Sequence, residues 1–239
     1  MDAYVINLDR SADRLARFRE INDHIGSVRR FPAIDGAAVD RQSLVRAGIF
    51  EADILEFWRP GAVGCALSHL DLWEEVISSG RPALICEDDA IFHARFGAFS
   101  EQLLGALGPG WDIVKWGWNY NAFFAFDIPG LTTIRWIVRA NTADTSLKVD
   151  EFQRYAVAPT IVRVRQSFGT LGYSVSPAGA ERLRAFCRPI RRMTIPGITP
   201  TPIQNGGIDI MMNGVPEIRA FAALPPLIMS RGDVPTTIY

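Results

Sequence analysis

The chain has 239 residues, of which 48% are hydrophobic and 21% are charged, so it can form a substantial core and is not expected to be disordered. Its formal net charge of −1 provides no basic excess for binding a phosphate backbone, which argues against a nucleic-acid partner. The three cysteines, Cys65, Cys86 and Cys187, are odd in number and widely spaced, which favours a reducing compartment over a disulfide framework.

The N-terminal segment and the hydropathy pattern give no sign of export or membrane insertion. The opening residues, MDAYVINLDR, lack the basic start and the long apolar run of a signal peptide. No apolar stretch approaches the roughly 20 residues that a membrane-spanning helix needs. We therefore expect a soluble cytoplasmic protein, and peripheral contact with the inner membrane stays open.

Strands and helices alternate along the predicted chain. Ser11 is expected to cap the first helix, and a well-patterned helix is expected to begin at Ser68 and end at Gly80. Ser176 followed by Pro177 predicts the start of a late helix. Residues 40–58 are expected to be helical in pieces, residues 96–107 to form another helix and residues 189–207 to form a long loop. Strands are predicted over 4–8, 30–33, 83–86, 112–116, 160–164 and 172–175.

This alternation predicts an α/β fold with a mostly parallel central sheet flanked by helices. Ligands of such sheets bind beyond the carboxyl ends of the strands. An acidic triplet stands at one of these predicted strand ends, directly after residues 83–86. The end of that strand is therefore the first place at which we expect a functional site.

The triplet consists of Glu87, Asp88 and Asp89. Three buried acids would repel one another, and a divalent cation such as Mn²⁺ or Mg²⁺ would remove that cost while bridging the turn to a diphosphate. If the strand continues, Glu87 and Asp89 should point to one side and Asp88 to the other. A solvated acidic turn or a helix cap is the competing interpretation, and the triplet alone does not decide between them.

Four segments occur in a characteristic order: YVINLDRSADRLARF, FPAIDG, GAVGCALSHLDLWEEV with ALICEDDAIF, and GYSVSPAGAERL. Together they resemble glycosyltransferase family 25, the lipooligosaccharide-type galactosyltransferases whose relatives include the collagen galactosyltransferases. The resemblance implies a GT-A-type, Rossmann-like fold, a UDP-sugar donor, an Mn²⁺-like cofactor and inversion at the anomeric carbon. It implies one domain over 1–239, with a nucleotide-sugar and metal half over about 1–117 and an acceptor half over about 118–239.

The resemblance also implies roles for individual residues in the first half of the chain. Glu87 and Asp89 match the acidic metal-and-diphosphate motif, with Asp88 between them. Asp35 ends a predicted strand and can accept a ribose hydroxyl, although Asp-Gly is also an ordinary turn sequence. Nucleotide contacts are expected in the opening motif, at Asn7, Asp9, Arg10 and Arg14. An arginine there can bind phosphate with two hydrogen bonds, and a solvated helix face is the alternative, most strongly for Arg14.

Two further positions are candidates for binding and catalysis. Ser68 and His69 are expected at a helix N-terminus, whose free N–H groups favour anions. We assign His69 a donor- or acceptor-positioning role against a purely structural one, and we expect Ser68 mainly to cap the helix. Asp209 matches the late aspartate of the family and is the first candidate for the base that takes the acceptor proton, an effect worth roughly 10²- to 10⁴-fold. A helix cap or a further metal ligand are the alternatives for Asp209.

The acceptor half contains many aromatic residues, which we divide between the core and a site for a saccharide or aglycone acceptor. They are Trp111, Trp116, Trp118, Tyr120, Phe123, Phe124, Phe126 and Trp136. The expected activity is transfer of galactose, with glucose as the rival sugar, in surface polysaccharide or lipopolysaccharide biosynthesis. A metal-dependent phosphohydrolase, which would recruit Asp112 as well as Asp209, and a non-catalytic nucleotide-sugar-binding relative are the competing functions.

Overall fold

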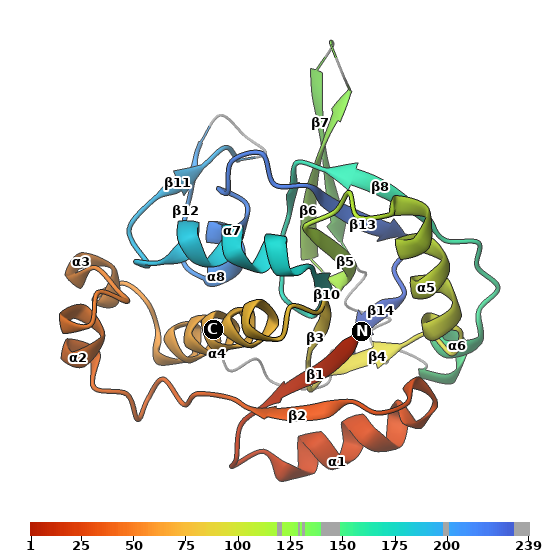
Figure 1. Cartoon of the computed structure of the whole chain (residues 1–239), viewed down its shortest axis with the longest axis horizontal. Coiled ribbons are helices and arrows are strands. Elements are labelled where there is room, and N and C mark those ends of the chain that lie inside the picture. The colour runs from red at the N-terminus through yellow and green to blue at the C-terminus, as the bar shows by residue number, and fades with distance from the viewer. Residues whose placement is uncertain (119–120, 129, 131, 140–148, 198–200, 232–239) are drawn as a thin grey trace.

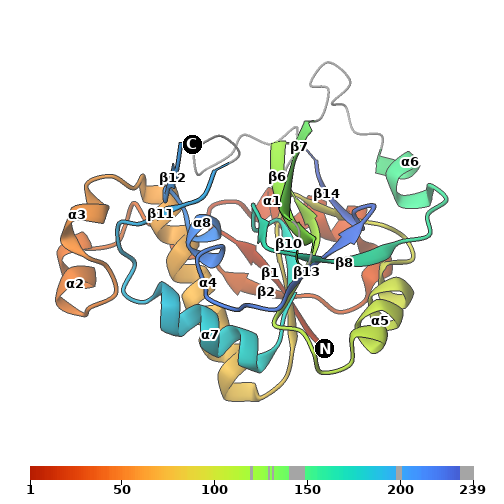
Figure 2. The same ribbon diagram turned by 90° about the horizontal axis from the view of Figure 1, so that it is seen from above.

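The computed structural model describes residues 1–118, 121–128, 130, 132–139, 149–197 and 201–231. A central nine-stranded sheet has helices on both faces, with α4 (Pro60–Ser79) and α7 (Pro177–Cys187) on one face and α1 (Ala12–Ile21) and α5 (Phe96–Leu107) on the other (Figures 1 and 2). The strands of this sheet are β1 (Asp2–Asn7), β2 (Arg29–Pro32), β3 (Ala83–Glu87), β4 (Ala90–Phe92), β5 (Ile113–Trp118), β8 (Thr160–Val164), β10 (Gly172–Val175), β13 (Ala220–Leu224) and β14 (Ile228–Ser230).

The helices of the described chain follow here in chain order. They are α1 (Ala12–Ile21), α2 (Arg41–Arg46), α3 (Ala52–Leu55), α4 (Pro60–Ser79), α5 (Phe96–Leu107), α6 (Val149–Arg154), α7 (Pro177–Cys187) and α8 (Ile208–Met212), with a 3₁₀ turn at Asp23–Ile25. Among the described residues, no helix has both the length and the apolar character needed to cross a bilayer.

The strand order is β2-β1-β3-β10-β5-β13-β8, and β14 and β4 continue beside β5. The pairings make β1, β2, β3, β5, β13 and β14 run in one direction, whereas β4, β8 and β10 run the other way. The predicted α/β architecture with a mostly parallel central sheet is therefore confirmed. Because β1, β2 and β3 are parallel neighbours, their carboxyl ends meet at one edge of the sheet.

Side chains that alternate along the buried strands divide the core between the two faces of the sheet. Tyr4 and Ile85 pack in the cluster under α4 and α7, whereas Val5 and Leu84 pack under α1 and α5. This alternation follows from the two-residue period of a strand. Strands covered on both faces are read as continuous apolar runs, which is why the short runs in the sequence predicted them correctly.

The largest difference from the predicted elements is the start of α4. This helix begins at Pro60 and continues to Ser79, with Gly80 in the left-handed conformation at its end. The prediction that Ser68 caps the helix is therefore wrong, because Ser68 and His69 lie in the middle of α4. Proline is well suited to the first helical position, but proline and glycine close together in a sequence normally indicate a break, and this concealed the first two turns.

A close backbone contact explains why α4 has a glycine at position 64. A Cβ atom on Gly64 would lie 2.2 Å from the carbonyl oxygen of Ile34, and a Cβ on Gly36 would lie 1.9 Å from the carbonyl oxygen of Pro60. Only glycine allows the segment after β2 to lie this close to the helix. Ser68 Oγ joins the same two segments, since it accepts from Ile34 N–H at 2.9 Å and donates to the Gly64 carbonyl at 2.8 Å.

The aromatic segment forms a hairpin that projects from the sheet (Figure 1). Strands β6 (Asn121–Ile128), β7 (Thr132–Arg139) and β9 (Gln166–Ser167) form a separate three-stranded sheet, and β11 (Thr194–Ile195) and β12 (Ile203–Gln204) form a two-stranded one. Most of the predicted aromatic cluster is core: Trp111, Trp116, Trp118, Phe123 and Phe124 are buried. Trp136 is 54% exposed, and Tyr120 lies outside the described residues.

Candidate active site

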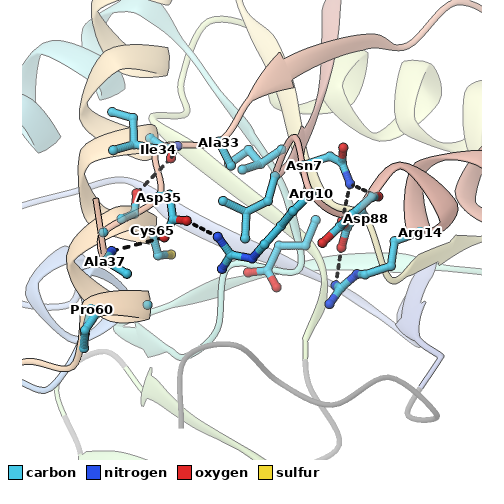
Figure 3. Close-up of a pocket in the computed structure, with 18 of the residues that line it drawn as sticks. Asn7, Arg10, Arg14, Ala33, Ile34, Asp35, Ala37, Pro60, Cys65 and Asp88 are labelled. Atoms are coloured by element: carbon cyan, nitrogen blue, oxygen red, sulfur yellow. Dashed lines mark hydrogen bonds and ion pairs between the residues drawn. The ribbon is translucent and has the colours of Figure 1, made fainter. Parts of the chain in front are cut away.

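A cavity of about 330 Å³ opens where β1, β2 and β3 end (Figure 3). Its volume lies at the lower end of the range for small-molecule sites. The wall is formed by four segments that are distant in sequence: the β1–α1 turn, the segment after β2, the first half of α4 and the end of β3. Of the residues singled out in the sequence, Asn7, Arg10, Arg14, Asp35, Ser68, His69, Glu87 and Asp88 line this cavity.

The N-terminus of α4 faces this cavity, which moves the expected anion-binding helix end from Ser68 to Pro60. Arg59, Pro60 and Gly61 all line the cavity. The first N–H groups of a helix have no acceptor within the helix, and they favour a negative charge. A 20-residue helix therefore directs its positive end at the site, with the Arg59 side chain beside it.

Two arginines from the opening motif cross the cavity to carboxylates on other segments, as Figure 3 shows. Arg10 pairs with Asp35, and Arg14 pairs with Asp88. The Arg10–Asp35 pair is largely exposed, with 56% and 37% of the two side chains accessible, so it contributes little to stability. An anionic ligand can thus take over Arg10 at small cost, which would release the Asp35 carboxylate into the same cavity.

Asn7 organises this network and has few atoms left for a ligand. It is 2% exposed, and its amide nitrogen donates to Asp88 Oδ2 at 2.7 Å and to the Ser11 carbonyl at 2.9 Å. Its amide oxygen accepts from Arg30 Nε at 3.1 Å. Asp9 does not line the cavity; its side chain is 86% exposed and pairs with Arg30. The structure therefore places Asn7 behind the site and Asp9 beside it.

The three adjacent acids occupy three different environments. Glu87 and Asp88 line the cavity, whereas Asp89 turns toward β14 and accepts from Ser230 Oγ at 2.6 Å. The condition for Glu87 and Asp89 to share one side is not met, because β3 ends at Glu87 and the next two residues form a turn, but Asp89 is still close enough to raise the pKa of Glu87 by repulsion. The Asp88 charge is balanced by Arg14, but the pKa of Asp89 is raised, mainly by burial, and its Oδ1 is buried with no hydrogen-bond donor among the described residues.

Glu87 is the acid whose protonation is most perturbed. Burial raises its pKa to about 7, and Asp89, Asp88 and Asp209 add to this effect by repulsion. Thr170 opposes the shift by donating its hydroxyl to Glu87 Oε1 at 2.5 Å. Asp209, in the first turn of α8, accepts from Gly169 N–H at 3.0 Å and is close enough to Glu87 to affect its charge. The fold thus brings the late aspartate to the acidic turn.

Lys115 is a site residue that the sequence analysis missed. It is 3% exposed in β5, and its ammonium donates to the Gly169 carbonyl at 2.5 Å. Burial lowers its pKa to about 8, while the carboxylates of Asp209 and Glu87 oppose that change. The sequence did contain a signal for this residue. Lys115 is one of only two lysines in the chain and stands in an otherwise apolar strand, and a buried lysine normally has an acidic partner.

The acidic residues fit a divalent cation that takes only part of its ligands from the protein. The carboxylates of Glu87 and Asp89 are both held with raised pKa values, and Asp89 has an oxygen without a partner. Within the described ranges, no three His, Cys, Asp or Glu side chains converge to form a closed metal site. Mg²⁺-like ions are commonly bound in this way, with one or two carboxylates and the remaining ligands from phosphate and water.

His69 lines the cavity from the middle of α4 and is fully buried. Its Nδ1 lies 2.8 Å from Tyr173 Oη, and its Nε2 has no hydrogen-bond partner in the described part of the chain. Burial lowers the pKa of His69 to about 3, and the Lys115 charge adds to this effect. The imidazole is therefore neutral, and with so low a pKa it is too weakly basic to serve as the proton-accepting base near pH 7.

Comparisons with known proteins agree with this geometry. The family profile described as glycosyltransferase family 25 (LPS biosynthesis protein) matches residues 1–198. A glycosyltransferase 25 family member from Aedes aegypti is 28% identical over 191 residues, which cover 75% of this chain and 27% of that protein. Procollagen galactosyltransferase 1 from Danio rerio is 25% identical over 244 residues, which cover 95% of this chain and 36% of that protein. Inactive glycosyltransferase 25 family member 3 from Homo sapiens is 27% identical over 208 residues, covering 80% and 30%. The chain therefore spans about a third of the length of these relatives.

Proposed function

The chain belongs to glycosyltransferase family 25, and from this premise we propose that it transfers a hexose from a UDP-sugar to a hydroxyl group of a saccharide or aglycone acceptor. Galactose is the first candidate sugar and glucose the second. We place the reaction in surface polysaccharide or lipopolysaccharide biosynthesis and expect inversion at the anomeric carbon. The observation that carries the proposal is the cavity in which a helix N-terminus and two arginines meet Glu87 and Asp88, with Asp209 close enough to Glu87 to raise its pKa by repulsion.

The cationic side of the cavity suits the diphosphate of the donor. Arg10 and Arg14 line it together with the first turn of α4, and each arginine can form bidentate hydrogen bonds with phosphate. Both arginines are held by carboxylates. Binding of UDP would therefore exchange one anion for another at Arg10, and the released Asp35 can accept a ribose hydroxyl.

The acidic side suits the transfer step. Glu87 and Asp89 would hold Mn²⁺ or Mg²⁺, which when bound neutralises the charge that develops on the departing diphosphate. Asp209 is our candidate for the base that takes the proton from the acceptor hydroxyl, because Gly169 N–H fixes one of its oxygens and leaves the other available. Inversion follows if the acceptor oxygen attacks directly from the side opposite the diphosphate.

Calorimetric titration with UDP tests this proposal most directly. The purified protein is titrated with UDP in the presence of Mn²⁺ and again after excess chelator. We expect binding that depends on the metal, followed by turnover when UDP-galactose or UDP-glucose is supplied with a saccharide acceptor. Absence of UDP binding under both conditions would remove the donor assignment and the roles of Glu87 and Asp89.

The structure makes a phosphohydrolase a weaker alternative. Asp112, which that reading would recruit, directly precedes β5 and so lies at the sheet edge opposite the cavity, where it is fully buried and bonded to Arg219. Release of free phosphate or sugar without an acceptor would favour this alternative. A non-catalytic relative stays in contention because a similar human protein is named inactive, and metal-dependent UDP binding without turnover would favour it.

A further inference from the structure

Three buried side chains on α4 and β10 form a hydrogen-bonded chain that ends at the cavity. Trp73 Nε1 donates to Tyr173 Oη at 3.0 Å, and Tyr173 Oη lies 2.8 Å from His69 Nδ1. All three residues have no exposed surface. The contacts join residues about 100 positions apart, so they result from the packing of α4 against the sheet and not from local sequence.

The direction of these hydrogen bonds follows from the donor inventory. The indole N–H of Trp73 can only donate, so the Tyr173 oxygen is its acceptor. The phenolic proton then needs an acceptor of its own, and His69 Nδ1 is the other hydrogen-bonding partner that the described residues provide. A neutral imidazole that accepts at Nδ1 carries its proton at Nε2. The arrangement therefore sets the tautomer of His69.

The resulting Nε2–H group has no acceptor within the described part of the protein. A buried donor without a partner destabilises the folded protein, and such groups are rare in folded proteins. His69 also lines the cavity, so an acceptor atom of a bound ligand can satisfy this group. An unpartnered, fully buried donor at a cavity is the observation that indicates a ligand contact.

The chemical surroundings indicate which part of the ligand would supply that acceptor. Lys115 Nζ lies 4.9 Å from the centre of the Tyr173 ring and interacts electrostatically with Glu87, Asp209 and His69. His69 and the Glu87 and Asp209 carboxylates therefore share Lys115 as a charged neighbour. A neutral N–H donor beside carboxylates is suited to a hydroxyl group, which can accept from the donor and donate to a carboxylate.

We infer that Trp73 and Tyr173 hold His69 in the Nε2-protonated tautomer, so that this N–H donates a hydrogen bond to a hydroxyl of the hexose in the donor substrate. The inference rests on the proposed function for the identity of the ligand. His69 is then a substrate-contacting residue for sugar recognition, and Tyr173 and Trp73 are positioning residues. A site that hydrogen-bonds a sugar hydroxyl discriminates strongly against sugars that lack it or direct it elsewhere.

Nuclear magnetic resonance tests the tautomer without any ligand. The protein has three histidines, so ¹⁵N-histidine labelling gives few signals, and loss of one set in His69→Gln assigns it. His93 is an internal reference, because its Nε2 donates to the Tyr155 carbonyl at 3.1 Å and its Nδ1 accepts from Arg95 N–H at 3.1 Å. We expect His69 and His93 to show the same Nε2-protonated pattern. Protonation of His69 at Nδ1 would overturn the inference.

The Tyr173→Phe variant tests the cause of that tautomer. Loss of the hydroxyl removes the donor to Nδ1, so we expect the His69 signals to change toward a mixture of tautomers while those of His93 stay unchanged. Tyr4→Phe is the matched control, since its buried hydroxyl contacts Arg29 and lies outside the cavity wall. An unchanged His69 pattern in Tyr173→Phe would contradict the positioning role.

Calorimetry with two ligands separates the sugar contact from the rest of the site. We expect His69→Asn, whose amide lies near the position of Nδ1, to bind UDP normally but to bind the preferred UDP-hexose about tenfold more weakly than wild type. His69→Gln, whose amide nitrogen can replace Nε2–H, should recover part of that loss. Equal weakening of UDP and UDP-hexose would overturn the inference. Wild-type protein that binds no UDP would instead refute the proposed function, while the tautomer measurement would still stand.

Discussion

The cavity and the β6–β7–β9 hairpin sheet use buried side chains in opposite ways. Near the cavity, carboxylates and a lysine are buried close together. Burial raises the pKa values of Glu87 and Asp89 and lowers that of Lys115, so it favours the neutral form of all three. At the base of the hairpin, the buried side chains are rings: Phe123 stacks on Phe168 with centroids 4.6 Å apart, and Phe124 meets Trp118 edge to face.

This difference separates a region shaped for binding from a region shaped for stability. Buried charges and unpartnered polar atoms destabilise the folded state unless a ligand compensates them, whereas buried aromatic rings stabilise it directly. The two regions also touch, since Phe168 immediately precedes the Gly169–Thr170 segment that contacts the acids. We therefore expect substitutions at the cavity to affect activity and substitutions at the hairpin base to affect folding.

The largest expected effect is on turnover. Asp209→Asn should lower the transfer rate by roughly 10²- to 10⁴-fold, because the amide cannot take the acceptor proton, while UDP binding stays near wild type. Asp89→Asn should lower turnover and metal-dependent UDP binding together. Asp127→Asn, on the exposed part of the hairpin, is the matched carboxamide control and should keep wild-type rates. Near-normal turnover in Asp209→Asn would refute the base assignment.

In the hairpin we expect substitutions to change stability, and to change it far more at the buried base than on the outer strand. Phe124 is 1% exposed and Trp136 is 54% exposed, although they are paired neighbours on β6 and β7. Phe124→Ala should lower the free energy of unfolding by about 3–5 kcal/mol, because it leaves a cavity in the core. Trp136→Ala should cost less than about 1 kcal/mol. Chemical denaturation measures both, and similar losses would mean that Trp136 is covered in solution.

The contact between α4 and the segment after β2 is expected to tolerate no added carbon. Gly64→Ala should destabilise the protein by about 1–3 kcal/mol and weaken UDP binding, because the new methyl group would force the helix away from the cavity wall. Gly105→Ala in α5 is the matched control, since a Cβ there meets nothing within 4 Å, and it should be neutral or slightly stabilising. Equal thermal stability of the two variants would contradict the close contact.

The smallest effect is expected in the pH dependence of stability. Glu87 has a folded-state pKa of about 7 against an ordinary value of 4.5, so between these values the folded state binds more protons than the unfolded state. The free energy of unfolding of metal-free protein should therefore fall as pH rises from about 4.5 to 7, by roughly 1–2 kcal/mol. Glu87→Gln should flatten this part of the curve, and Mn²⁺ should stabilise wild type more than the variant. Identical pH profiles would show that Glu87 is not the group responsible.

The site residues that could be predicted from the sequence share one property, which is a place in a short local motif. Arg10, Arg14, Asp35, Glu87 and Asp88 each follow a predicted strand or open a helix, and all of them line the cavity. The predicted strand end pointed to the acidic turn, and the resemblance to the family added Arg10, Arg14 and Asp35. They meet in the fold because the carboxyl ends of parallel strands lie at one edge of the sheet. The alternation of strands and helices determined the fold class.

The features that were missed depend on contacts between distant segments. Lys115 and Thr170 reach the acids only because β10 lies between β3 and β5, an order that crosses the sequence. The start of α4 was misplaced because Pro60 and Gly61 looked like a helix break, and the backbone contact of Gly64 with Ile34 and Gly36 exists only in the folded chain. The local spacing of apolar residues predicts whether a segment is a helix or a strand, but it does not predict which other segments will pack against it.

The sequence by itself therefore determined the α/β class, the edge of the sheet that carries the site, and eight of the residues in its wall. The tertiary structure decided which of those residues are free to act. It paired Asn7 and Asp88 within the protein, turned Asp89 toward Ser230, placed Glu87 in the cavity wall, and left His69 Nε2 without a hydrogen-bond partner among the described residues. The physical reason is that protonation and hydrogen bonding depend on burial and on partners from other segments, and both exist only once the chain has folded.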